Sequence, residues 1–139
     1  MEKQNRTIVL TESQLGVIFK ALDVYSRLGA LQFEEALLFD FIVHNDLNGN
    51  VRDVTDKHFQ SCRTYLANLL GYENYTGYWN LGIASKNVPD VCKIAYELEH
   101  DIGHFNYIKN GSKGVSVFSD EGLKLTKLPH MKILDNTNE

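Results

Sequence analysis

The sequence has few of the features that mark disulfide-stapled, metal-binding or membrane proteins. Only two cysteines occur, Cys62 and Cys92, and their spacing fits neither a metal site nor a redox motif. No apolar run approaches the roughly 20 residues of a membrane-spanning helix. The first residues also lack the cationic-then-apolar pattern of a secretion signal. These absences predict a cytoplasmic protein, with no membrane partner, that folds around an ordinary apolar core.

Basic residues form no cluster in the sequence. The 14 lysines and arginines are dispersed among 18 acidic residues, and the net charge is −4. Duplex nucleic acid needs a concentrated basic surface, so it is not expected as a partner. A small anionic ligand stays compatible with this composition, because two or three well-placed cations are enough to bind it.

Motifs of the common catalytic classes are missing as well. The sequence has no Gly-x-Ser-x-Gly elbow and no glycine-rich phosphate loop, and neither cysteine stands beside a histidine. No catalytic residue and no cofactor is therefore predicted.

Hydrophobic periodicity predicts a single domain of the α+β class that is mostly α-helical. A helical core of three or more helices is expected, followed by a small C-terminal β-hairpin. The expected parts are an N-terminal strand or arm at 1–10, the helical core at 11–110, the hairpin region at 111–134 and a tail at 135–139. The hairpin prediction depends on Val115 and Val117, and then Leu123 and Leu125, which alternate with polar residues.

The first helical segment, residues 12–44, begins with a capping-box pattern at Thr11 and Gln14. Gly29 and the alanine after it interrupt the helical pattern, either as a kink or as a point of close packing. The continuation, residues 33–43, is apolar nearly all round. Such a helix is either central in its domain or covered by a partner chain, and we expect a homo-oligomer.

Two further helices are expected at about residues 56–70 and 89–107. The predicted buried stripe of the second helix consists of Phe59, Cys62, Leu66, Leu69 and Leu70. The predicted buried stripe of the third consists of Val91, Ile94, Ala95, Leu98, Ile102 and Phe105.

The third helix carries the string His100-Asp101-Ile102-Gly103, which resembles the signature of HD-domain phosphohydrolases. The resemblance implies that His100 and Asp101, with the upstream His58 and a downstream Asp120 or Asp135, hold a metal that activates water. Helical geometry gives a different interpretation, because His100 lies opposite the predicted apolar stripe. We therefore favour a charged, solvated helix face without a metal.

Residues 46–50 resemble the start of a calcium loop, with oxygen-bearing side chains at alternate positions. Val51 stands where such a loop needs glycine, and Lys57 where it needs a carboxylate. A polar turn after a helix is the favoured interpretation.

The loop at residues 71–80 interleaves aromatic residues, including Tyr78 and Trp79, with Asn and Gly. This composition suits stacking on a planar ligand, and Lys86, Arg63 and Arg27 are candidate partners for its phosphate. The alternative is that these aromatic side chains cover the core.

Residues 10–15 and 21–34, together with the stretch from residue 80 to residue 98, resemble small helical proteins encoded by bacteriophages. Some phage proteins of this size are sponges that sequester cyclic nucleotide or ADP-ribose-type immune signals without cleaving them. The resemblance implies that Tyr25 and Arg27 face a ligand pocket. It also implies that the protein acts in the cytoplasm of an infected host cell.

The sequence thus predicts a non-enzymatic oligomeric binding protein, specifically an anti-defence protein that sequesters a nucleotide signal. The expected ligand-binding residues are Tyr25, Arg27, Arg63, Tyr78, Trp79 and Lys86. One alternative is an HD-type phosphohydrolase with a metal at His58, His100 and Asp101. Another is an inhibitor that binds a target protein directly.

Overall fold

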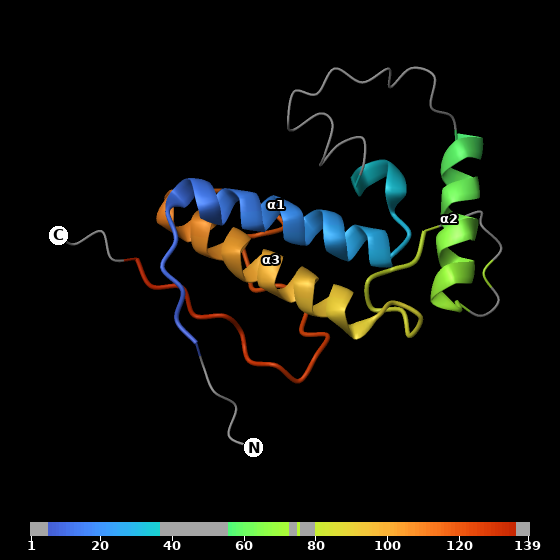
Figure 1. Ribbon diagram of the computed structural model, residues 1–139. Coiled ribbons are helices and arrows are strands. Elements are labelled where there is room, and N and C mark those ends of the chain that lie inside the picture. Colours follow the sequence, from blue (N-terminus) through green and yellow to red (C-terminus); the bar gives the residue numbers. More distant parts are fainter. Residues whose placement is uncertain (1–5, 37–55, 73–74, 76–79, 136–139) are drawn as a thin grey trace.

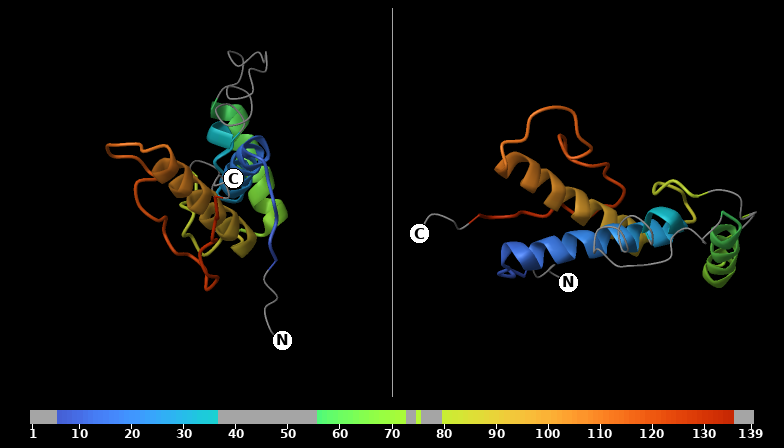
Figure 2. Two further views of the ribbon diagram at one scale, coloured as in Figure 1. Left: turned by 90° about the vertical axis from the view of Figure 1, so that its left-hand side faces the viewer. Right: turned by 90° about the horizontal axis from the view of Figure 1, so that it is seen from above.

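The computed structural model describes residues 6–36, 56–72, 75 and 80–135. It contains the helices α1 (Glu12–Gly29), α2 (Asp56–Leu70) and α3 (Asp90–Lys109). Helices α1 and α3 pack side by side in opposite directions, and α2 stands beyond one end of this pair (Figures 1 and 2). None of the helices in the described ranges is long and apolar enough to cross a membrane.

The start of α1 has the predicted capping box. The Thr11 hydroxyl accepts a hydrogen bond from the Gln14 backbone N–H at 3.2 Å, and the Gln14 side chain accepts one from the Thr11 N–H at 2.9 Å. These two bonds satisfy backbone donors that the first helical turn leaves without partners. The prediction of a helix that starts after Thr11 is confirmed.

All three helices end in the same way, with a residue in the left-handed conformation that lets the chain fold back on the last turn. Glycine occupies this position after α2 (Gly71, φ 68°) and after α3 (Gly111, φ 60°), whereas Leu31 (φ 59°) occupies it after α1. Leu31 is fully buried, and its burial offsets the strain of a left-handed leucine. The bond from the Gln32 N–H to the Arg27 carbonyl (2.9 Å) closes this end. This bond places Gln32 beside Arg27.

Helix α1 therefore ends at Gly29, and the expected segment 12–44 is not one continuous helix. Residues 33–36 add a short helical turn, and residues 37–44 lie outside the described part of the chain. The predicted range of the second helix agrees with α2, but its predicted stripe is wrong at Cys62, Leu69 and Leu70, which are exposed. Periodicity marks one face of α2, but it does not tell how far other elements cover that face.

Gly29 is a point of close packing between α1 and α3. A Cβ atom built on Gly29 would lie 2.3 Å from the Cys92 sulfur, so only glycine fits here. The prediction of a close-packing point is confirmed. Ala30, Val88 and Cys92 form the buried core beside it. The Tyr72 hydroxyl, whose pKa burial raises to about 12, donates to the Gly29 carbonyl at 2.8 Å and ties the end of α2 to this junction.

The predicted C-terminal hairpin at 111–134 is wrong, since residues 112–135 contain no strand. Residues 114–131, here called the strap, run back along α3 (Figure 1). The strap reaches Glu97 at Thr126 and has returned as far as Asp101 at Met131. The strap bonds to α3: the Tyr107 hydroxyl donates to the Gly114 carbonyl at 2.6 Å, and a His104 ring nitrogen lies 2.9 Å from the Phe118 carbonyl. Its internal bonds are short-range turn bonds, such as that from the Ser119 N–H to the Ser116 carbonyl at 3.1 Å. An N-terminal strand is also not observed, because residues 6–10 are irregular and exposed.

Candidate functional site

A cleft of about 300 Å³ lies between α1, α3 and the strap. Its polar lining consists of Asp23, Ser26, Arg27, Gln32, Tyr96, Glu99 and His100. The strap contributes Val117 and Phe118, and the loop before α3 contributes Ile83. This cleft is where charged and aromatic side chains of α1 and α3 meet, and it is the candidate site.

The α1 wall presents an arginine that its neighbours hold in place. Arg27 Nε donates to both carboxylate oxygens of Asp23, at 2.9 and 3.0 Å, one helical turn away. Arg27 Nη1 donates to the Gln32 side-chain oxygen at 3.0 Å. Gln32 is itself tied by its amide to the Leu81 carbonyl at 3.3 Å. The guanidinium is thus held in one orientation by groups on both sides of the end of α1.

The α3 wall presents a buried carboxylate paired with a histidine. The Glu99 side chain is 5% exposed, and its Oε2 lies 2.6 Å from His100 Nδ1. The same nitrogen lies 3.3 Å from the Tyr96 carbonyl, and both contacts favour a proton on Nδ1. Burial alone would lower the pKa of His100, but the hydrogen bond and charge of Glu99 outweigh it and raise this pKa.

The His100 ring is fixed on its faces and on one edge. Its centroid lies 4.1 Å from the Tyr96 ring and 5.3 Å from the Phe118 ring. Gly122 of the strap packs against the ring, since a Cβ there would lie 2.7 Å from His100 Cδ2. Within the described part of the chain, no hydrogen-bond partner is found for His100 Nε2 or for Glu99 Oε1.

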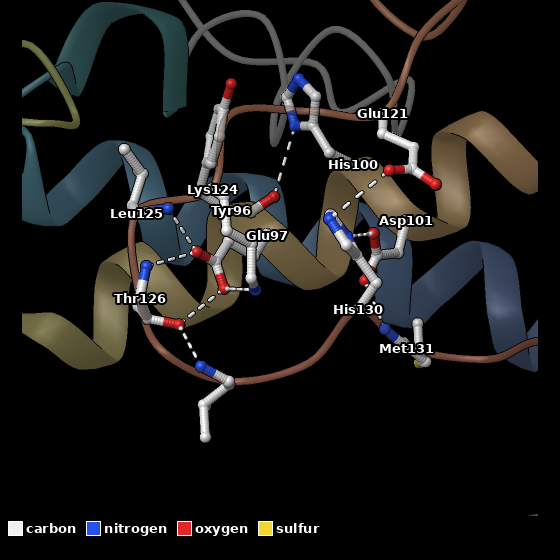
Figure 3. A network of polar contacts seen from close by, with 11 residues as sticks. Tyr96, Glu97, His100, Asp101, Glu121, Lys124, Leu125, Thr126, His130 and Met131 are labelled. Carbon is white, nitrogen blue, oxygen red and sulfur yellow. Dashed lines mark hydrogen bonds and ion pairs between the residues drawn. The ribbon is translucent and has the colours of Figure 1, made fainter.

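Glu97, on the strap-facing side of α3, is the main anchor of the strap (Figure 3). Its Oε1 accepts the backbone N–H groups of Leu125 (2.5 Å) and Thr126 (2.6 Å). Its Oε2 accepts the Thr126 hydroxyl and the Lys124 ammonium, both at 2.7 Å. Burial alone would raise the pKa of Glu97, but the hydrogen bonds from Lys124, Thr126 and Leu125 together lower it to about 2.

Asp101 anchors the returning half of the strap. One carboxylate oxygen accepts the Met131 N–H at 2.6 Å, and the other lies 2.7 Å from His130 Nδ1 (Figure 3). His130 Nε2 lies 3.6 Å from the Glu121 carboxylate. The predicted solvated face of α3 is therefore wrong: Glu97 and Asp101 are covered, and their oxygens serve the backbone donors of an irregular segment. The spacing of apolar residues in α3 could not predict that backbone N–H groups of the strap would cover Glu97 and Asp101.

The structure does not bring the proposed metal ligands together. His58 is an exposed residue of α2, whereas His100 faces the cleft and Asp101 faces the strap. Asp120 is exposed, and Asp135 pairs with Lys109 at 3.3 Å. The described ranges contain no group of three or more His, Cys, Asp or Glu side chains that could hold a metal ion. The calcium-loop candidate at 46–50 lies outside the described residues.

Of the predicted ligand-binding residues, the structure places Arg27 in the cleft. Tyr25 is 51% exposed on α1 and does not line it. Arg63 lies on α2 and hydrogen-bonds to Tyr75, and Lys86 is exposed on the loop before α3. Tyr78 and Trp79 lie outside the described residues.

Sequence reasoning did not select Glu99, Tyr96 or Gln32 as site residues. The available signal was the position of Glu99 directly before His100. Comparison of the chain with protein-family models, with curated proteins and with solved structures gives no significant match.

Proposed function

We propose that this protein is a non-enzymatic binding protein that holds a small nucleotide in the cleft between α1 and α3. The observation that carries the proposal is the convergence of Arg27, Tyr96, Glu99 and His100 on one cleft of about 300 Å³. That volume is at the lower end of the range for small-molecule sites, so it suits a mononucleotide better than a dinucleotide. The nucleotide class itself comes from the resemblance to phage sponges, and sequestering an immune signal is part of the proposal.

Arg27 supports the binding of an anionic group. A planar guanidinium matches phosphate oxygens with paired N–H groups, and charge-assisted bonds of this kind are among the stronger ones in proteins. Asp23 and Gln32 already hold the guanidinium in position. Little side-chain entropy is therefore lost when a ligand binds it.

The Tyr96 ring, which lines the cleft, supports the binding of a planar group. Stacking of a base on an aromatic side chain contributes about 1–3 kcal/mol. The contacts among Tyr96, His100 and Phe118 fix the orientation of these rings before a ligand arrives.

Ser26 supports binding in preference to covalent catalysis. Its hydroxyl lines the cleft but donates to the Asp23 carbonyl at 2.9 Å, and it is not paired with a histidine that would activate it. Homo-oligomerisation remains a prediction, because residues 37–43, which carry most of the expected contact, lie outside the described part of the chain.

The test is calorimetric titration of the full chain with 3′,5′-cyclic GMP and 3′,5′-cyclic AMP, alongside native mass spectrometry. We expect binding of at least one cyclic nucleotide and its release intact on heating. Arg27→Ala should weaken binding about tenfold or more, as expected for loss of a charged hydrogen bond. Lys86→Ala is the matched control, because Lys86 is exposed and lies off the cleft.

Two results would contradict the proposal. Recovery of only hydrolysed nucleotide would show that the protein is an enzyme. Absence of binding to either nucleotide, or equal loss of affinity in Arg27→Ala and Lys86→Ala, would show that the cleft is not the nucleotide site.

A further inference from the structure

Glu99 is a buried carboxylate in the cleft with one oxygen that lacks a donor. The residue is 4% exposed and lines the cleft, and its Oε2 is engaged by His100 Nδ1 at 2.6 Å. Among the described residues, none donates a hydrogen bond to its Oε1. This oxygen is accessible from the cleft, since the buried side-chain oxygen without a partner in the described residues belongs to Glu35. A ligand that covers the oxygen must bring N–H donors to it, because covering a charged acceptor without a donor is unfavourable.

The groups around Glu99 restrict what such a ligand can be. A carboxylate can accept two parallel N–H bonds. Guanine presents N1–H and N2–H side by side on one edge, next to the acceptor O6. Adenine and cytosine place a ring-nitrogen acceptor beside their amino group, and its lone pair would face the carboxylate. Uracil offers one N–H between two carbonyl groups.

His100 is consistent with the same edge. Glu99 raises the pKa of His100, which favours a proton on Nε2 in addition to the one on Nδ1. An Nε2–H donor suits guanine O6 and does not suit the amino group that adenine carries at the corresponding position. Tyr96, whose ring lies against that of His100, supplies a face for the base to stack on.

We infer that the cleft selects a guanine-type base and that Glu99 is the specificity-determining residue. The base then lies against α3, and the phosphate lies toward Arg27 on the α1 wall. This inference rests on the proposed function, because it assigns which nucleotide that site takes.

The wild-type chain tests the inference with three ligands: cyclic GMP, cyclic IMP and cyclic AMP. Cyclic IMP keeps N1–H and O6 but lacks the 2-amino group, so it removes one of the two donors. We expect cyclic GMP to bind about tenfold more tightly than cyclic IMP. We expect it to bind about 100-fold or more tightly than cyclic AMP, because adenine directs a ring-nitrogen lone pair at the carboxylate where guanine has an N–H donor.

Glu99→Gln tests the residue. The substitution keeps the shape of the side chain but replaces one acceptor oxygen with an amino group. The cyclic GMP to cyclic AMP affinity ratio should fall at least tenfold, mostly through weaker binding of cyclic GMP. Glu121→Gln, the same substitution at an exposed strap position outside the cleft, should leave the ratio unchanged.

The outcomes separate the two proposals. Similar affinities for all three ligands, or an unchanged ratio in Glu99→Gln, would overturn the guanine inference and leave nucleotide binding intact. Failure of all three ligands to bind would overturn the proposed function and this inference with it. If Glu99→Gln does not fold, the comparison of cyclic GMP with cyclic IMP in the wild type still decides the question.

Discussion

Replacing Glu97 with glutamine should detach the strap from α3. The carboxylate accepts four hydrogen bonds from Lys124, Leu125 and Thr126, which lower its pKa from 4.5 to about 2. At about 1.36 kcal/mol per pH unit, this difference corresponds to about 3 kcal/mol of stabilisation by the ionised form. Glutamine keeps one acceptor oxygen for the two backbone N–H groups. Its side-chain NH₂ group would instead face the Lys124 ammonium and the Thr126 hydroxyl, which now donate to Oε2. We expect Glu97→Gln to lose about 2–3 kcal/mol at pH 7.

The pH dependence of this loss follows from the direction of the pKa shift. Because the folded-state pKa of Glu97 lies below its unfolded value, its contribution is complete above about pH 4.5. It then declines as the pH falls toward about 2. The difference in unfolding free energy between wild type and Glu97→Gln should therefore be constant near neutral pH and shrink steadily between pH 4.5 and pH 2.

Urea denaturation at a series of pH values measures this difference, and hydrogen exchange at the Leu125 and Thr126 amides shows whether the strap opens by itself. Glu121→Gln is the control, because the Glu121 side chain is 68% exposed and lies 3.6 Å from its histidine partner. We expect that variant to change stability by about 0.5 kcal/mol or less. A loss below about 1 kcal/mol in Glu97→Gln, with unchanged amide exchange, would refute the role of Glu97 as the strap's main anchor.

Two glycine substitutions test the packing of α3 against its neighbours. Gly29→Ala places a Cβ 2.3 Å from the Cys92 sulfur and should lower the unfolding free energy by about 2 kcal/mol or more. Adding Cys92→Gly should recover part of that loss in a double-mutant cycle. Additive losses in the cycle would contradict the close packing of Gly29 on Cys92. Gly103→Ala places a Cβ 2.3 Å from the Phe118 ring and should expel that ring, at a cost of about 1–3 kcal/mol. Faster exchange of the Phe118 amide should accompany the loss, and unchanged ring resonances in NMR spectra would contradict it.

Local chemistry made the helix boundaries predictable. Thr11 and Gln14 form a capping box from residues three positions apart, so the start of α1 could be read directly. Gly71 closes α2 where a left-handed residue is needed. Leu31 fills the same position after α1, and the end of that helix was missed because no sequence rule expects a leucine there.

The site was less predictable, because its residues come together only when α1 packs on α3. Arg27 was predicted as a phosphate partner of the loop at residues 71–80 and, through the resemblance, as a pocket residue, and the structure places it in the cleft between α1 and α3. Glu99 is adjacent to His100 in sequence and Tyr96 precedes it by one helical turn, yet their common cleft depends on the close packing at Gly29 and on the strap. The residue pattern of one helix does not show which residues of another helix will line a cleft with it.

The wrong prediction of a C-terminal hairpin is explained by the way the strap packs on α3, and the same packing helps to form the cleft. Val115, Val117, Leu123 and Leu125 have the alternation of a hairpin, but alternation predicts strands only when the backbone donors have a strand to pair with. Here the Leu125 and Thr126 N–H groups donate to the Glu97 carboxylate, and Val115 and Val117 are exposed instead of facing a core. The same placement brings Phe118 and Gly122 against His100. A charged helix face next to an irregular segment is therefore a candidate docking surface, and in this protein that docking completes the third wall of the cleft.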